Sequence, residues 1–245
     1  MTVNQLVSLP AMAQKKLLRF AEIKTFPHVF EYPKEMQGKW RYFFKNENPV
    51  VLELACGRGE YTVGLATLFP DQNFIGVDVK GNRMFIGAKK TLKEGTSNAA
   101  FLRTQIEMLA EYFDEEEVDE IWITFPDPQL RTSRAKKRLT HPRFLRLYQN
   151  ILKPGGLIHL KTDSPALYRF TKIVAKLYDL DILEDCDDVY GQENIKDELL
   201  IKTHYESLDI AKSKKIHYLQ FRLPAELEMI DEQLQEILKD EEQAD

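Results

Sequence analysis

Cysteine and long apolar runs are both scarce in this chain of 245 residues. The two cysteines, Cys56 and Cys186, lie far apart in the sequence, which is typical of reduced thiols in a cytoplasmic protein. No stretch approaches the roughly 18 consecutive apolar residues of a membrane-spanning helix. The segment from Met1 to Phe20 also lacks the continuous apolar stretch of a signal peptide. We therefore expect a cytoplasmic protein without a membrane partner.

Motifs for phosphate cradling, serine nucleophiles and metals are missing as well. The chain has no Walker A loop, no G-x-G-x-x-G loop and no nucleophile elbow. A nicotinamide-dependent dehydrogenase is disfavoured, because it needs a glycine loop that cradles pyrophosphate. No metal site is expected either, because four histidines show no metal-ligand spacing with one another or with the cysteines: His141, His159, His204 and His217.

Acidic residues outnumber basic residues in the whole chain, but the excess of acidic residues lies in one segment. The formal net charge of the chain is −5. Residues 224–245 hold nine acidic residues and one lysine, a net charge of −8, so residues 1–223 carry +3. The body of the protein can therefore still present a basic face to a polyanion.

Apolar runs rich in β-branched residues alternate with helical patterns along the chain. Strands are expected over 50–55, 73–78, 100–104, 120–125 and 157–162, and helices over 61–68, 80–93 and 142–152. This alternation predicts βαβ units and a parallel sheet. Two later strands, near 181–184 and 216–223, are separated by a long insertion, which suits an antiparallel strand at the sheet edge. The expected fold is α/β and Rossmann-like, with a mostly parallel seven-stranded sheet and helices on both faces.

The composition divides the chain into three parts. Residues 1–48 are polar and aromatic and are expected to form an arm packed on the core, and residues 49–223 form the main domain. Residues 224–245 begin as an amphipathic helix, for which the simplest interpretation is a solvated, dispensable segment. That helix is predicted from apolar residues at helical spacing, namely Leu227, Ile230, Leu234, Ile237 and Leu238.

The segment from Glu53 to Gly59 (ELACGRG) follows the first expected strand and opens a helix. Glycines there let the backbone approach a ligand closely, although an ordinary strand–helix turn would look similar. Asp78, at the end of the second strand, can accept hydrogen bonds from ribose hydroxyls, or it can cap the helix that starts near Lys80. Because no third glycine follows until Gly64, the loop favours S-adenosylmethionine, which has no phosphate, over a dinucleotide.

The motif FPDP at 125–128 ends the fourth expected strand, where open α/β sheets bind their ligands. It holds the carboxylate of Asp127 between two prolines. The following segment, RTSRAKKRLTHPRFLR at 131–146, has seven basic residues and no acidic one. A plain turn followed by a solvated helix would mix charges, whereas a cluster of one sign beside an expected site is typical of contact with a phosphate backbone. Two weaker motifs are KTD at 161–163 and THYE at 203–206.

Together these motifs resemble those of the bacterial tRNA (guanine-N7-)-methyltransferases, which are class I methyltransferases. The resemblance runs from about residue 20 to residue 223 and includes FAEIKTFPHVFEYP, the glycine loop, FPDP followed by KKRLTHPRFL, LIHLKTD and TxYE. It implies S-adenosyl-L-methionine as the methyl donor and tRNA as the partner. The implied acceptor is guanine N7 at position 46 of the variable loop. Whether the chain is a monomer or a homodimer stays open.

The resemblance also assigns roles to residues. Cofactor contacts are implied for Glu53, Gly57, Gly59, Asp78, Gln105 and Asp127, of which Asp127 is also the expected catalytic residue. Substrate contacts are implied for Arg131, Asp163, Thr203, Tyr205 and Glu206. In the basic segment, contacts to tRNA phosphates are expected from Arg134, Lys136, Lys137 and Arg138.

The chain departs from the family pattern in three places: in its glycine loop, at Gln105 and beside its FPDP motif. Ala55 stands where the first glycine is usual, Gln105 replaces an Asp, and the residues 129–131 (QLR) replace Trp-Pro-Lys. These changes bear on guanine recognition more than on reaction type. Guanine N7 carries a lone pair and no proton, so Asp127 is expected to orient the base and stabilise developing charge, not to remove a proton. Asp163 could select guanine by accepting from its N1–H or amino group.

Two other functions stay open from the sequence. One is a class I methyltransferase that acts on another RNA or on a substrate other than RNA. The other is a non-catalytic RNA-binding module, in which Glu53 and Asp78 would bind no cofactor.

Overall fold

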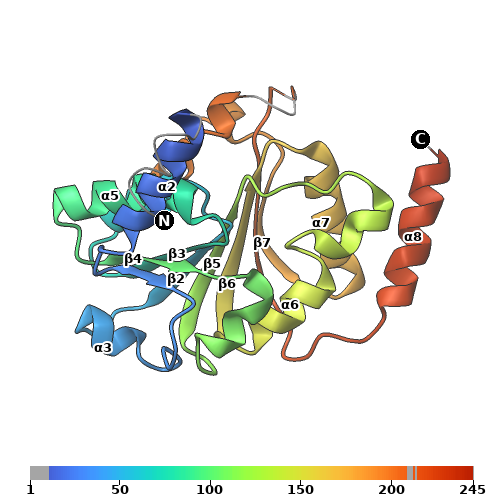
Figure 1. The fold of residues 1–245 in the computed structure, drawn as a ribbon. Coiled ribbons are helices and arrows are strands. Elements are labelled where there is room, and N and C mark those ends of the chain that lie inside the picture. Colours follow the sequence, from blue (N-terminus) through green and yellow to red (C-terminus); the bar gives the residue numbers. More distant parts are fainter. Residues whose placement is uncertain (1–10, 209–211, 213, 245) are drawn as a thin grey trace.

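A twisted sheet with helices on both faces organises the molecule, as the computed structural model shows for residues 11–208, 212 and 214–244 (Figure 1). The order of strands across the sheet is β1-β4-β3-β2-β5-β6-β8-β7. The strands are β1 (Val29–Glu31), β2 (Val50–Leu54), β3 (Asn73–Asp78), β4 (Ala99–Arg103), β5 (Val118–Thr124), β6 (Leu152–Thr162), β7 (Asp181–Cys186) and β8 (His217–Arg222). Residues 1–10 of the expected arm and Asp245 of the expected tail lie outside the described part.

The expected fold class is confirmed, with eight strands in place of seven. The added strand, β1, comes from the expected arm and pairs in parallel with β4. Strand β8 is antiparallel to both β6 and β7. Because it pairs with both, it is the second strand from one edge of the sheet, and β7 is the edge strand. Strand β6 starts at Leu152, earlier than expected, because a register shift against β5 admits the Pro-Gly-Gly segment into the strand.

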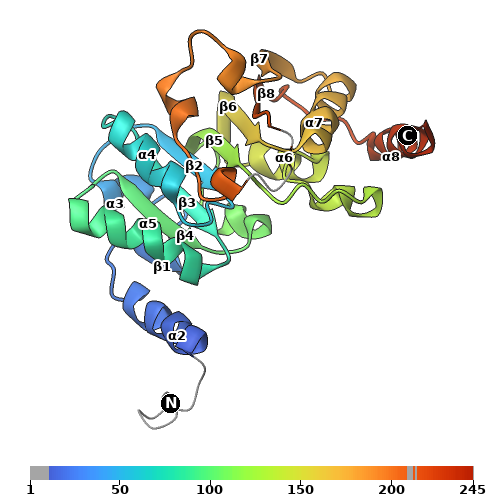
Figure 2. The same ribbon diagram turned by 90° about the horizontal axis from the view of Figure 1, so that it is seen from above.

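The helices divide between the two faces of the sheet (Figures 1 and 2). One face carries α2 (Ala11–Ile23), α4 (Glu60–Leu68) and α5 (Gly81–Glu94), and the other carries α3 (Trp40–Phe44), α6 (Pro142–Gln149) and α7 (Pro165–Leu177). The short helices are η1 (Ile106–Glu111), η2 (Thr132–Lys137), η3 (Val189–Gly191), η4 (Asp197–Leu200) and η5 (Glu206–Leu208). Within the described residues, no helix combines the length and apolarity needed to cross a bilayer.

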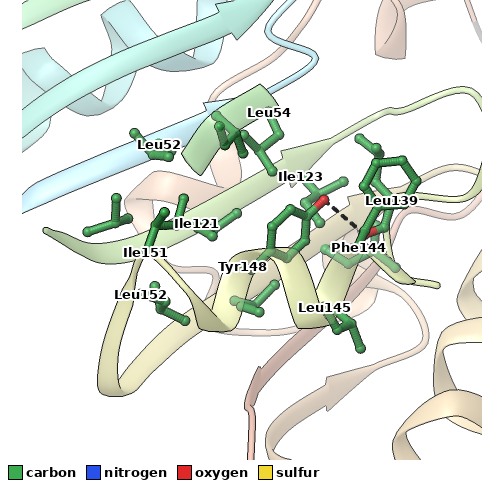
Figure 3. Close-up of a cluster of buried hydrophobic side chains, with 14 of the residues drawn as sticks. Leu52, Leu54, Ile121, Ile123, Leu139, Phe144, Leu145, Tyr148, Ile151 and Leu152 are labelled. Carbon is green, nitrogen blue, oxygen red and sulfur yellow. Dashed lines mark hydrogen bonds between the residues drawn. The ribbon is translucent and has the colours of Figure 1, made fainter. Parts of the chain in front are cut away.

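The core beneath the α6 face holds the central strands in place (Figure 3). The hydroxyl of Tyr148 donates to the carbonyl oxygen of Leu139 at 3.1 Å, so the ring is buried with its polar atom satisfied. This layer fixes β5, which ends at the FPDP turn. Its interdigitating side chains come from β2, β5 and α6, and each is at most 3% exposed: Leu52, Leu54, Ile121, Ile123, Phe144, Leu145 and Tyr148.

The C-terminal helix α8 (Asp231–Ala244) is packed on the protein, not solvated as expected. Leu234 is 0% exposed and Leu238 is 8% exposed, and both belong to the main core cluster. Asp231 accepts from the guanidinium of Arg146 through both carboxylate oxygens, each at 2.6 Å, and from the Tyr178 hydroxyl at 2.7 Å. The apolar stripe that predicted the helix therefore has a partner surface, and its first turn has a charged anchor.

Candidate active site

A cavity of about 700 Å³ opens beyond the carboxyl ends of β2, β3, β5 and β6. The chain order reverses between β2 and β5, and such switch points are where open α/β sheets bind ligands. The wall includes five residues singled out from the sequence: Gly57, Asp78, Asp127, Asp163 and Tyr205. The structure therefore brings three segments to one cavity: the glycine loop, the FPDP turn and the insertion between β7 and β8 that contains THYE at 203–206, called the late insertion below.

Asp78 connects the glycine loop to the start of α5. Its Oδ2 accepts from the backbone N–H of Gly57 at 2.9 Å, and its Oδ1 accepts from the backbone N–H of Lys80 at 2.7 Å. Each carboxylate oxygen has a second lone pair, so both can still accept from a ligand hydroxyl. Asp78 therefore holds the turn before α5, whose N-cap residue Lys80 has no side-chain cap hydrogen bond, and this role is compatible with holding a ribose.

Three positions in the glycine loop, Ala55, Gly57 and Gly59, adopt left-handed backbone conformations. Ala55 has φ 57°, a conformation that suits glycine and costs alanine about 1–2 kcal/mol. Gly57 has φ 56°, and an added Cβ would lie 3.2 Å from the ring of Tyr205. Tyr205 thus covers the loop, and the guanidinium of Arg83 lies 5.5 Å from the centre of its ring.

The FPDP turn presents the carboxylate of Asp127 to the cavity. Asp127 Oδ1 accepts from the backbone N–H of Gln129 at 3.0 Å, and the prolines on either side restrict the turn. Phe125 and Gln129 both have φ 46°, so the turn is bounded by two left-handed residues. Such conformations persist where the surroundings over-determine them, and here the surroundings include Arg138.

Arg138 stabilises this turn through hydrogen bonds to its backbone, whereas the sequence had predicted a contact to a tRNA phosphate. The side chain donates to the carbonyl oxygen of Gln129 at 3.1 and 3.2 Å and to that of Leu130 at 3.3 Å. Its guanidinium lies 4.4 Å from the ring centre of Phe170, and the residue is only 5% exposed, so burial lowers its pKa. A buried guanidinium with internal acceptors is not placed to contact a tRNA phosphate.

The other expected phosphate contacts face solvent. Arg134, Lys136 and Lys137 are exposed on η2, and Arg131 is exposed just before it. Arg131 is not part of the cavity wall, although its neighbour Leu130 is.

Three expected cofactor contacts lie away from the cavity wall. Glu53 is 3% exposed: its Oε2 accepts from the N–H and the hydroxyl of Thr62, and its Oε1 accepts from the hydroxyl of Thr124. It thereby joins β2 to α4 and β5, and burial raises its pKa to about 7. Gly59 serves packing, because an added Cβ would lie 2.5 Å from the ring of Phe101. Gln105 is exposed at the start of η1.

The late insertion is tied to β6 by a buried ion pair that sequence reasoning missed. Lys161 is 0% exposed and its Nζ lies 3.2 Å from Glu206 Oε2, with further donation to the carbonyl oxygens of Leu199 and Ile201 at 2.8 and 3.0 Å. Burial lowers the pKa of Lys161, and Glu206 opposes that shift. The signals in the sequence were the lysine of the KTD motif at a strand end and the glutamate of THYE, and nothing local links the two.

Glu206 and Thr203 therefore differ from their expected role as substrate contacts. The hydroxyl of Tyr190 also donates to Glu206, and Thr203 Oγ1 accepts from the backbone N–H of Glu206 at 3.1 Å. Neither side chain is on the cavity wall; both hold the segment that places Tyr205 there.

Solved structures of similar shape define the fold. The 30S ribosomal A1408 methyltransferase from an uncultured bacterium superimposes with a TM-score of 0.57 at 19% identity, covering 80% of this chain and 98% of that one. The 16S rRNA methyltransferase KamB gives 0.58 at 15% identity, covering 80% and 99%. At these identities the likeness shows the fold alone, which is that of the class I methyltransferases.

Similar sequences identify the family within that class. The family model described as "Putative methyltransferase" matches residues 47–219. Curated relatives named tRNA (guanine-N(7)-)-methyltransferase are 52% identical in Porphyromonas gingivalis, over 82% of this chain and 86% of the relative, and 47% identical in Bacteroides thetaiotaomicron, over 88% of each. Another, from Christiangramia forsetii, is 45% identical over 86% of this chain and 99% of its own length. The chain belongs to the tRNA (guanine-N(7)-)-methyltransferase family.

Proposed function

We propose that this methyltransferase transfers the methyl group of S-adenosyl-L-methionine to N7 of a guanine in the variable loop of tRNA. The observation that carries the proposal is the cavity that gathers Gly57, Asp78, Asp127 and Asp163 from four strand ends. Exposed basic residues follow the same turn that presents Asp127. The names of the relatives at 45% to 52% identity support the same reaction.

The residues of the cavity fit the proposed cofactor. Asp78 keeps lone pairs for ribose hydroxyls, and Gly57 leaves no side chain between the loop and Tyr205. The loop lacks the G-x-G-x-x-G pattern of a pyrophosphate cradle, which agrees with a cofactor that has no phosphate. When bound, S-adenosylmethionine would supply an electrophilic methyl group on a sulfonium.

The protein's own contribution is positioning and electrostatics. Guanine N7 needs no deprotonation before it attacks, and the base gains positive charge as the methyl group is transferred. The Asp127 carboxylate, held in a proline-flanked turn and braced by Arg138, would stabilise that charge without reorganising. Asp163, on the same wall, would accept from the N1–H or amino group of guanine and so disfavour adenine. Alignment of the two reactants would provide most of the remaining rate enhancement.

Nucleoside mass spectrometry tests the reaction and its position. The protein and cofactor are incubated with a tRNA transcript and with a matched transcript whose variable-loop guanine is adenine. We expect 7-methylguanosine from the first transcript alone. No 7-methylguanosine from either transcript would refute the reaction, and equal amounts from both would refute the position.

The role of Asp127 is tested by Asp127→Asn, which keeps an acceptor for the N–H of Gln129. Turnover should fall by about 100-fold or more, because the charge-stabilising group is removed, while affinity for adenosylhomocysteine stays unchanged. Calorimetric titration and methyl-transfer rates measure the two effects. Asp71→Asn, an exposed turn residue before β3, is the matched control. Wild-type turnover in Asp127→Asn would remove Asp127 from the mechanism.

A further inference from the structure

A second cavity, of about 310 Å³, lies beside the candidate active site. The ionisable residues of its wall include three arginines and a histidine but no carboxylate. Arg19 comes from α2, Arg58 from the glycine loop, Arg83 from α5 and His204 from the late insertion. Arg83 also borders the active-site cavity, as does Tyr205, so the two spaces adjoin. Figure 1 shows α2 beside α5.

Two of the three guanidinium groups, those of Arg19 and Arg83, lie over aromatic rings. Arg19 lies 5.6 Å from the ring centre of Phe85, and Arg83 lies 5.5 Å from that of Tyr205. A cation–π contact of this kind uses no N–H group as a hydrogen-bond donor to a carboxylate of the protein, so the guanidinium can still donate to an anion.

The cluster carries an excess of positive charge. Among the described residues, no carboxylate forms a salt bridge with Arg19, Arg58 or Arg83. One acid nearby is Glu60, a half-buried residue whose pKa is raised by burial while Arg58 and His204 oppose the shift. Asp78 is a second carboxylate beside the cluster, on the wall of the active-site cavity with Arg83. Two carboxylates do not balance three guanidiniums, so an anion in this cavity would relieve their mutual repulsion.

The position of the cluster relates it to the substrate of the proposed function, on which this inference rests. One border of the active-site cavity is the FPDP turn with Leu130, which leads into the basic helix η2. Another is formed by Arg83 and Tyr205, which lead into the second cavity. An RNA strand whose base enters the active site can therefore meet cations on both sides of that base.

We propose that Arg19, Arg58, Arg83 and His204 form a subsite for a backbone phosphate of the tRNA strand that carries the target guanine. The other anion of matching chemistry is the carboxylate of the methyl donor. Three guanidiniums exceed what one carboxylate requires, and Arg19 belongs to the N-terminal arm, not to the strand-end loops that border the cofactor cavity.

The double variant Arg19→Gln/Arg58→Gln tests the subsite in the full-length protein. The affinity for tRNA is measured over about 50 to 200 mM salt, and the slope of log affinity against log salt should fall by about 0.7 to 0.9 if one phosphate is no longer neutralised. The affinity for adenosylhomocysteine should not change. Arg19→Lys/Arg58→Lys, which keeps the charge, should retain the wild-type slope. The control is Arg41→Gln/Arg222→Gln, which removes the same number of charges from two exposed arginines on α3 and β8.

Two results would overturn the inference. An unchanged salt slope would show that no phosphate is bound there, and an unchanged slope with weaker binding of adenosylhomocysteine would assign the cluster to the cofactor carboxylate. Thermal unfolding of each variant identifies a loss of fold, in which case the lysine double variant and single substitutions carry the comparison. Failure of the proposed function has a different signature, namely no 7-methylguanosine from the wild-type protein whatever the slope.

Discussion

Burial decides what the carboxylate of Glu53 can do. Its three hydrogen bonds come from Thr62 and Thr124, and burial raises its pKa from the ordinary 4.5 to about 7. The carboxyl group therefore keeps its proton in the folded protein at pH values where the unfolded chain has released it. By linkage, this group makes the folded state progressively less stable as pH rises from about 4.5 to about 7.

Glu53→Gln should remove that pH dependence. The amide oxygen can accept from Thr62 and the amide N–H₂ can donate to the hydroxyl of Thr124, so the packing is preserved. Between pH 4.5 and 7 the free energy of unfolding should fall less steeply than in the wild type, by up to about 1.4 kcal/mol per pH unit. Urea unfolding at several pH values measures this. The exposed Glu94→Gln serves as control, and identical slopes for Glu53→Gln and the wild type would contradict the assignment.

Arg138 shows the same effect of burial on a cation. It belongs to a run of seven basic residues, and nothing in the run distinguishes it from Arg134 or Lys137. In the folded protein it is 5% exposed and braces the turn that carries Asp127. Its neutralisation should therefore affect catalysis through the turn, and it is kept intact in any test of phosphate binding.

At the scale of elements, α8 is part of the core. Its apolar stripe faces the cluster that includes α6 and α7, and the Arg146–Asp231 pair anchors its first turn. The acidic composition of residues 224–245 had favoured a solvated helix, because charge content reports on the exposed face and not on what the apolar face meets.

Leu234→Ala should accordingly destabilise the protein by about 2–5 kcal/mol, because Leu234 is 0% exposed and its removal leaves a cavity. Met229→Ala, at a position 81% exposed, should change the free energy of unfolding by less than about 0.5 kcal/mol. Chemical denaturation of both variants makes the comparison. Equal, small effects would mean that α8 is not coupled to the core.

For the whole molecule, the distribution of charge matters more than its sum. The net charge of −5 hides a body of +3 and a C-terminal segment of −8. Cations on η2 and in the second cavity border the active site from two directions, so a polyanion can approach despite the acidic total.

Neutralising the exposed cations of η2 should therefore flatten the salt dependence of tRNA binding. The variant Arg134→Gln/Lys136→Gln/Lys137→Gln should lower the log–log salt slope by about 0.7 to 0.9 for each phosphate that is no longer neutralised, with Arg138 left in place. The control neutralises three exposed lysines on α5: Lys89, Lys90 and Lys93. A slope equal to that of the wild type would exclude η2 from the RNA-binding surface.

Much of the sheet could be predicted because the signals are local. A run such as 73–78 is apolar throughout most of its length and matches β3 at both ends, as expected for a strand buried on two faces. Strand β1 was missed because three residues carry too little periodicity, and its pairing with β4 is a contact between distant segments. The position of β8 between β6 and β7 likewise depends on long-range pairing.

The amino-acid sequence by itself determined the fold class, the order of its elements and the strand ends at which the chemistry gathers, because apolar periodicity and turn residues act over short distances. Only the tertiary structure decided which ionisable side chains face a ligand. Asp127 and Asp78 reach the cavity, while Glu53, Glu206 and Arg138 turn inward and hold its walls. The physical reason is that burial and hydrogen-bond partners are set by segments far away in the chain, and the residue type alone carries no record of them.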